Sequence, residues 1–192
     1  MINDPKIMAD TFNNFFTDVV PNIDKSIPKT PISPLSFLHN RIEKNFSFKP
    51  IDIPKVMTTV LLLDDTKSSG PSDIPIYILK LAAPIIIPEL VKILNLSFNE
   101  GIFPDLMKLA KVIPVFKSGS KLLVNNYRPI SLLSVFSKIF EKIAHEQLYD
   151  FVISQSIIYE SQFGFQKGKS TLLSLIEIVE NIRDCFERGN YG

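Results

Sequence analysis

The sequence contains only one cysteine and two histidines among its 192 residues. Cys185 cannot form a disulfide within the chain, and no group of cysteines and histidines has the spacing of a metal site. This scarcity argues against a structural zinc and against a disulfide-stapled domain, and it favours a reducing compartment.

Long uninterrupted apolar runs are also missing. The most apolar stretch, IIIPELVKIL, contains Pro88, Glu89 and Lys92, and the N-terminal MINDPKIMAD lacks a basic segment followed by an apolar core. Neither secretion nor a membrane span is therefore expected. Because 45% of the residues are hydrophobic, the chain can bury a substantial core, and its length predicts one domain or a domain with an extension.

The net charge is only +1, but the charges are unevenly distributed. Residues 1–107 carry 10 Lys and Arg against 12 Asp and Glu, residues 108–172 carry 9 against 4, and residues 173–192 carry 2 against 4. A basic middle segment suits a phosphate-bearing partner, although a solvated surface gives the same count.

Capping residues and apolar periodicity predict a mostly helical chain. Asp4 with Pro5 begins one amphipathic helix, the proline-rich IPKTPISPLSF follows as a linker, and Asp52 caps a second helix. Residues 77–101 are expected to form two helical stretches, the second ended by Gly101. Two further helices are expected over residues 134–152 and 170–187. The apolar face of the first contains Phe136, Ile139, Phe140, Ile143 and Leu148, and that of the second contains Leu172, Leu175, Ile176, Val179, Ile182 and Phe186.

An acidic pair, Asp64 and Asp65, follows the second of these helices. Such a pair could be taken for the metal-binding dyad of a polymerase. Because DDTKSSGPSDIP has the composition of a turn, we interpret the two carboxylates as a solvated helix end.

Two apolar runs, KVIPVF and YRPISLL, flank a connection rich in Lys, Ser, Gly and Asn. They predict a β-hairpin in which Lys117 leaves the first strand and Arg128 enters the second. Pro114 and Pro129 are each expected to remove a ladder hydrogen-bond donor, so these strands should lie at a sheet edge rather than in a sheet centre. Two cations on neighbouring strands suit contact with phosphate, but an ordinary solvated hairpin carries similar charges.

The C-terminal SQFGFQKGKST invites comparison with the phosphate-binding loop of nucleotide hydrolases. That loop needs four residues between its first glycine and the Gly-Lys pair and must follow a buried strand. Only Phe165, Gln166 and Lys167 separate Gly164 from Gly168, and a polar connection precedes them. The segment is therefore predicted to be a loop that enters the helix starting at Ser170.

Four segments occur together in an informative order: KSSGPSDIP, LNLSFNEGIFPDLMKLAKVIPVFKSGSK, NNYRPISLLSVFSKIFEKIAHEQLYDFV and SQFGFQKGKST. In this order and spacing they resemble the reverse transcriptases of non-LTR retrotransposons, especially the jockey-like and related animal LINE groups. The resemblance spans roughly residues 50–192 and, more loosely, DPKIMADTFNNFF near the N-terminus.

The resemblance implies the site residues. In this family the hairpin Lys and the Arg of the YRPI motif belong to the fingers, so Lys117 and Arg128 are the expected contacts to the triphosphate of an incoming deoxynucleotide. The second fingers motif lies near template and primer, and its matching residues here are Gly164, Phe165, Gln166, Gly168, Lys169 and Ser170. Two departures are that Gln166 replaces the usual Arg and that Ser72–Asp73 replaces the usual Asp–Gly.

The family's catalytic aspartates are expected beyond ERGNYG, in a palm region that these 192 residues do not include. Two-metal phosphoryl transfer needs those carboxylates, so no catalytic residue, metal ligand or cofactor is assigned to this chain, and Mg²⁺ is expected only in the full-length family enzyme. The chain alone is predicted to be inactive.

The sequence therefore predicts a mostly helical α+β fold: the fingers of a right-hand polymerase with a basic hairpin, the palm missing. Expected divisions are a helical extension with linker (1–49), a helical pre-fingers segment (50–96) and the N-terminal part of the reverse transcriptase domain (97–192). The expected partners are RNA template, DNA primer and deoxynucleotide, as part of the full-length enzyme, together with the missing palm, and no membrane partner is expected. The resemblance implies the cytoplasm and nucleus as the location of the family and leaves the location of this chain open. Two alternatives stay open, namely a decayed or co-opted module that binds protein or nucleic acid without catalysis and a helical scaffold without ligands.

Overall fold

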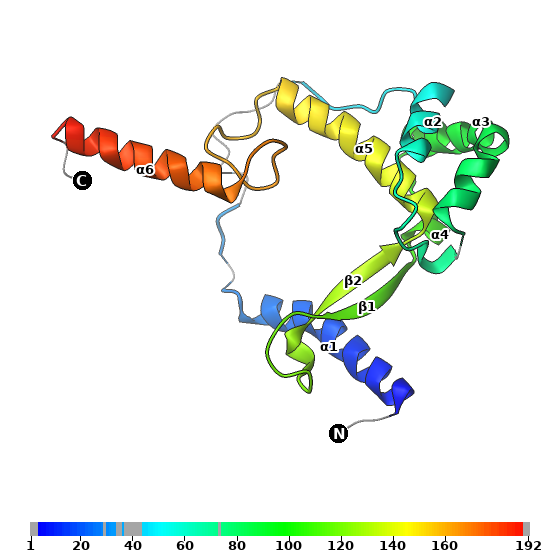
Figure 1. Ribbon diagram of the computed structural model, residues 1–192, viewed down its shortest axis with the longest axis horizontal. Helices are drawn as coiled ribbons and strands as arrows, with labels where there is room; N and C mark the ends of the chain where they lie inside the picture. The colour runs from blue at the N-terminus through cyan, green and yellow to red at the C-terminus, as the bar shows by residue number, and fades with distance from the viewer. Residues whose placement is uncertain (1–3, 29, 34–35, 37–43, 73, 190–192) are drawn as a thin grey trace. The chain divides into compact units, whose positions relative to one another are not determined.

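The computed structural model describes residues 4–28, 30–33, 36, 44–72 and 74–189. Within these ranges the chain is mostly helical and contains a two-stranded antiparallel sheet (Figure 1). The predicted α+β class is therefore confirmed at this level. Pro34 of the predicted linker and Asp73 of the predicted turn lie outside the described residues. The helices are α1 (Pro5–Ser26), α2 (Ile53–Leu61), α3 (Ile76–Glu100), α4 (Asp105–Lys108), α5 (Val135–Ser154) and α6 (Thr171–Glu187), the strands are β1 (Ala110–Phe116) and β2 (Tyr127–Leu133), and 3₁₀ turns cover Gly70–Ser72 (η2) and Val124–Asn126 (η3).

Three helices begin at the side-chain caps that the sequence predicts. The carboxylate of Asp4 accepts a hydrogen bond from the backbone N–H of Lys6 at 2.8 Å, and Asp52 accepts one from Lys55 at 2.9 Å. At the start of α6 the Ser170 hydroxyl accepts a hydrogen bond from the backbone N–H of Leu173 at 3.2 Å. Each cap satisfies a backbone donor that has no partner within its own helix.

One expectation about α3 is wrong. The two helical stretches predicted for residues 77–101 form one continuous helix that contains both Pro84 and Pro88. Each proline removes a hydrogen bond within the helix. The apolar stripe nevertheless continues past both of them, with Leu79, Ala83, Ile87, Leu90 and Leu94 all buried. Burial of that stripe outweighs the two missing bonds. The predicted end is confirmed, because Gly101 takes the left-handed conformation with φ of 68°.

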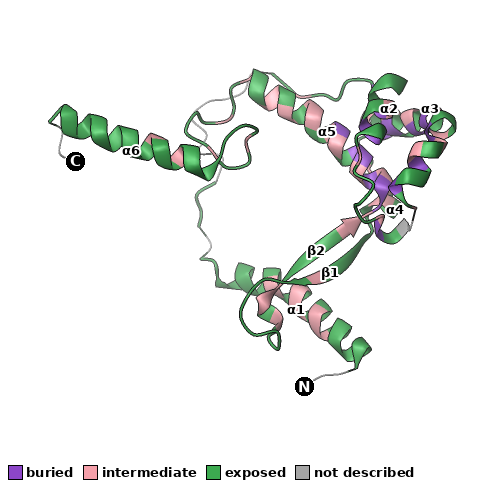
Figure 2. Cartoon of the chain, in the orientation of Figure 1, coloured by how far each residue is buried: buried purple, intermediate pink, exposed green. Residues whose placement is uncertain are grey.

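The hydrophobic core lies where α2, α3 and the first half of α5 meet (Figure 2). Phe140 of α5 is fully buried and makes edge-to-face contacts with Phe98 and Phe103, at centroid distances of 6.0 and 5.6 Å. The predicted core face of α5 is confirmed at Ile139, Phe140 and Ile143, which are buried, and Phe136 packs against them. Leu148, predicted on the same face, is exposed instead.

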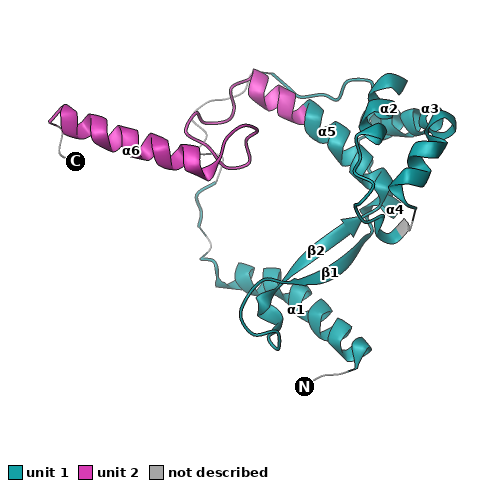
Figure 3. Cartoon of the chain, in the orientation of Figure 1, with its two compact units in different colours: residues 1–147 teal, residues 148–192 magenta. Residues whose placement is uncertain are grey.

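The described residues form two compact units, Met1–Gln147 and Leu148–Gly192 (Figure 3). The division falls inside α5, so its buried half belongs to the first unit. In the second unit the six apolar residues predicted for the face of α6 are all exposed. The predicted divisions after residues 49 and 96 stay predictions. Among the described helices none is long and apolar enough to cross a membrane.

The hairpin has a register in which Pro114 stands opposite Pro129. The backbone N–H of Lys117 donates inward to the Asn126 carbonyl at 2.8 Å. Because inward and outward positions alternate along an antiparallel strand, the nitrogens of both prolines face away from the partner strand. The edge position predicted for these strands is confirmed, whereas the expected loss of two ladder hydrogen bonds is wrong. The nitrogens of Pro114 and Pro129 lie along the outer edges of the two-stranded sheet, where no partner strand is paired among the described residues.

The turn η2 packs against the base of this hairpin through Gly70. The residue has φ of +68°, and a Cβ atom built on it would lie 2.2 Å from the carbonyl oxygen of Leu133. The ammonium of Lys138 donates to the Ser68 carbonyl just before this turn. A residue without a side chain is therefore required where the turn crosses the end of β2.

Replacing Gly70 with alanine should lower the free energy of unfolding by about 2–6 kcal/mol, since left-handed strain and overpacking each cost about 1–3 kcal/mol. Gly101→Ala is the matched control, because Gly101 has the same φ but no atom within 4 Å of its built Cβ. Urea denaturation of both variants measures the difference. Equal losses would show that the close approach to Leu133 contributes nothing.

Candidate phosphate-binding site

Lys117 and Arg128 lie on the same face of the hairpin. In the observed register Arg128 pairs with Val115, and Lys117 follows Val115 by two residues. Cross-strand partners share a face, and residues two apart on a strand return to it. Lys111, four residues before Val115, lies on this face as well. The sequence predicted the hairpin and its two cations, and the structure adds that they share a face.

These cations have no acidic partner within the described part of the chain. Lys111, Lys117 and Arg128 are exposed, and none forms an ion pair with a carboxylate of the described residues. The ammonium of Lys121, in the connection between the strands, lies 5.7 Å from the centroid of the Phe116 ring. A face whose Lys and Arg side chains form no ion pair with a described carboxylate favours binding of an anion with several oxygens, because both side chains donate hydrogen bonds to such oxygens.

The connection between the strands is held by Asn126 and Tyr127, which sequence reasoning did not single out. The Asn126 side-chain amide donates to the Ser120 carbonyl at 2.9 Å, and the Tyr127 hydroxyl donates to the Lys121 carbonyl at 2.9 Å. Gly119, with φ of +85°, passes against the Asn126 amide. The NNY that precedes Arg128 is the signal that could have indicated these bonds, since Asn is a frequent turn residue.

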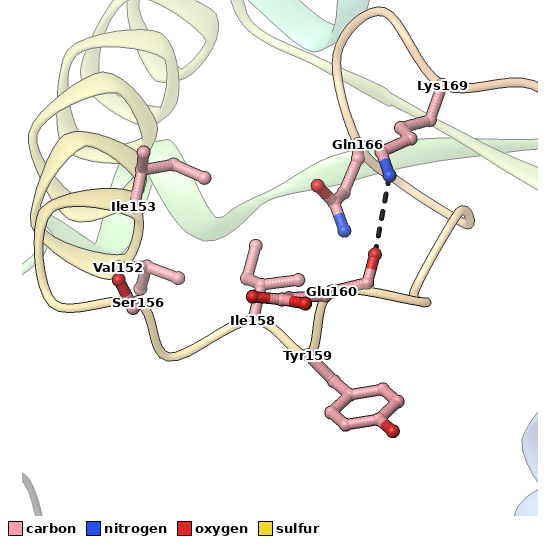
Figure 4. A pocket seen from close by; sticks show the side chains of 8 residues that line it. All are labelled: Val152, Ile153, Ser156, Ile158, Tyr159, Glu160, Gln166 and Lys169. Atoms are coloured by element: carbon pink, nitrogen blue, oxygen red, sulfur yellow. Dashed lines mark hydrogen bonds between the residues drawn. The ribbon is translucent and has the colours of Figure 1, made fainter.

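The second predicted group of residues lies in the other compact unit, in the loop between α5 and α6. Gln166 and Lys169 line a cavity of about 540 Å³ together with Ile153, Ile158 and Glu160 (Figure 4). The Lys169 ammonium donates to the Glu160 carbonyl at 3.3 Å and lies 4.3 Å from the centroid of the Phe163 ring. Lys169 therefore has contacts within its own loop.

Other residues of this loop face solvent. Phe165 is fully exposed and has φ of 60°, which is uncommon for a residue other than glycine. Gly168 has φ of 78°, and the Gln166 side chain donates to the Gln162 carbonyl. The predicted loop into a helix is confirmed, with Ser170 as the cap of α6. This loop and the hairpin belong to different units, and each is described by itself.

Asp64 and Asp65 form contacts typical of a turn. Asp64 accepts hydrogen bonds from the hydroxyl and the backbone N–H of Thr66, at 2.7 and 2.9 Å, and these bonds lower its pKa below the usual value. Asp65 pairs with Lys80 of α3 at 2.9 Å. Their positions agree with the interpretation as a helix end followed by a turn.

Comparison with known proteins identifies the class to which the chain is similar. No protein-family model matches it. Curated relatives are RNA-directed DNA polymerases of transposons: the probable enzyme from transposon BS of Drosophila melanogaster is 28% identical over 158 residues, which are 82% of this chain. The probable enzyme from the X-element of the same species is 26% identical over 155 residues, or 80% of the chain.

The enzyme from the mobile element jockey of Drosophila funebris is 27% identical over 144 residues, or 74% of the chain. The resemblance to jockey-like non-LTR reverse transcriptases is thereby confirmed. The matched segments make up 16–17% of the length of these relatives. The chain thus corresponds to a small part of each relative.

Proposed function

We propose that this chain supplies the fingers hairpin of an RNA-directed DNA polymerase from a non-LTR retrotransposon. The observation that carries the proposal is the exposed hairpin face on which Lys117 and Arg128 lie together without a carboxylate partner among the described residues. The ligand proposed for this face is the triphosphate of an incoming deoxynucleotide, and the similarity to RNA-directed DNA polymerases of transposons supports that proposal.

The two side chains suit that ligand in different ways. The planar guanidinium of Arg128 can donate two parallel hydrogen bonds to phosphate oxygens, whereas the ammonium of Lys117 is a mobile point charge. The loop at 164–170 is proposed to lie near template and primer. There the exposed ring of Phe165 offers a surface on which a base can stack.

The chain is proposed to contribute contacts rather than the chemical step. Two-metal phosphoryl transfer requires a group of carboxylates that holds the ions. Across the described ranges no three His, Cys, Asp or Glu side chains lie close enough to hold a metal ion. The described residues do not fit a magnesium site, and no catalytic step is assigned to them. Template RNA, primer DNA and a palm region are the partners that this role requires.

A second candidate function is a module that binds another protein without catalysis. The observation in its favour is α6, whose face formed by Leu172, Leu175, Val179 and Ile182 is exposed. Association through such a face changes little with salt, whereas binding through Lys117 and Arg128 weakens steeply as salt rises.

Binding of a fluorescent deoxynucleoside triphosphate at low salt tests the proposed function. Replacing Lys117 and Arg128 with glutamine should weaken binding by at least about 10-fold, because a hydrogen bond to a charged group contributes about 1.5–3 kcal/mol. The control is glutamine at Lys6 and Lys25, at the two ends of α1, which removes the same charge. If the control loses as much affinity as the hairpin variant, the assignment of the triphosphate site to Lys117 and Arg128 is wrong.

A further inference from the structure

An aromatic cluster covers the face of the hairpin opposite to Lys117 and Arg128. It consists of Phe116, Tyr127 and, from α1, Phe12. The Phe12 and Tyr127 rings meet edge to face at a centroid distance of 4.8 Å, and Phe116 and Tyr127 do so at 5.5 Å. Helix α1 also packs against the 3₁₀ turn η3 that leads into β2.

The cluster is coupled to the cations by the geometry of a strand. Phe116 directly precedes Lys117, and Tyr127 directly precedes Arg128. Successive side chains of a strand point to opposite faces. A contact that fixes the two rings on one face therefore fixes the backbone that presents the two cations on the other face.

Within the described residues, few other contacts hold the tip of the hairpin, the end that carries Phe116 and Tyr127. A two-stranded ribbon is at best marginally stable by itself. Its base packs against η2, but Val115 and Ile130 on the cationic face are exposed. Phe12 and Tyr127 are half-buried through their contact. Along the described chain, the cover over the tip comes from α1.

We propose that Phe12 is a positioning residue for the phosphate site, and that α1 is the element that holds the hairpin tip in its binding geometry. The inference rests on the proposed function for its ligand. Its structural part is that contact with Phe12 stabilises the hairpin tip, and this part can be tested without any ligand. Phe12 lies about one hundred residues before the hairpin and acts on the phosphate only through Tyr127.

Amide hydrogen exchange measures the structural part directly. The N–H of Lys117 is protected by its bond to the Asn126 carbonyl. Phe12→Ala should accelerate its exchange by about 2- to 12-fold, the range expected for loss of one aromatic pair. The control is Val20→Ala, because Val20 lies on α1 and is exposed, so its loss should leave the exchange of the Lys117 amide unchanged. Unchanged exchange in Phe12→Ala would overturn the inference.

Triphosphate binding measures the functional part. Phe12→Ala should raise the Kd for the labelled deoxynucleoside triphosphate about 2- to 12-fold, and Phe12→Tyr, which keeps the ring, should restore it. In the background of K117Q and R128Q, Phe12→Ala should have no further effect on the Kd but should still accelerate exchange. A further loss of affinity in that background would show that Phe12 does not act through the cations.

The two proposals fail in different ways. If K117Q and R128Q leave triphosphate affinity unchanged, the proposed function fails, while the exchange of the Lys117 amide still tests the dependence on Phe12. Phe12→Leu serves as a second variant in case the alanine variant does not fold, since it keeps apolar volume at α1 but loses the edge-to-face pair. Thermal unfolding of the core of α2, α3 and α5 should be the same in all variants.

Discussion

Binding of single-stranded RNA by the 192-residue chain should weaken by at least about 10-fold when Lys117 and Arg128 are both replaced by glutamate. RNA phosphates offer the hairpin face the same chemistry as a triphosphate. Each lost phosphate contact should also reduce the slope of log K against log salt by about 0.7, because fewer counterions are released on binding. A fluorescence titration at several salt concentrations measures both quantities.

The control for this charge reversal is glutamate at Lys6 and Lys25, which changes the net charge equally. It should alter affinity weakly and leave the salt slope nearly unchanged. Gln166→Arg is a further test, since it should strengthen RNA binding if the loop at 164–170 lies along the RNA strand. If the control lost as much RNA affinity and salt slope as the hairpin variant, the basic segment would be only a solvated surface and not a phosphate site.

Phe140→Ala should lower the free energy of unfolding of the first unit by about 3–5 kcal/mol. The ring is fully buried and contacts Phe98 and Phe103, so its removal loses apolar burial and leaves a cavity between α3 and α5. Denaturation in urea followed by circular dichroism measures the loss.

The matched comparison is Phe165→Ala, which removes the same atoms from a fully exposed position. This change should stay within about 0.5 kcal/mol. Phe140→Leu should lie between the two, because most of the apolar volume remains. If the exposed and buried alanine variants unfold alike, the described core is wrong.

Local signals in the sequence were sufficient for the ends of several helices. Asp52, Ser170 and Gly101 each act on backbone groups within a few residues, so their chemistry is visible without the fold. The continuity of α3 was not visible in this way. Pro84 and Pro88 indicate a break locally, and only burial against α2 and α5 keeps the helix intact.

For the candidate site, too, the sequence predicted the local features but not the contacts that depend on the fold. The strands that carry Lys117 and Arg128 follow from apolar runs and a turn composition, but their common face depends on a register that the sequence did not specify. The contact between Phe12 and Tyr127 joins segments far apart in the chain, and neither neighbourhood predicts the other. Contacts of this kind depend on the fold and leave no periodic pattern.

The opposed prolines of the hairpin have a consequence for self-association. An exposed strand edge normally offers a row of donors and acceptors to any extended chain, and such edges lead to aggregation. Here the middle of both edges lacks a donor, because the nitrogens of Pro114 and Pro129 face outward. A third strand added on either side would lose a hydrogen bond at its centre. The ribbon is thereby kept two strands wide, with α1 against one face and the proposed anion site on the other.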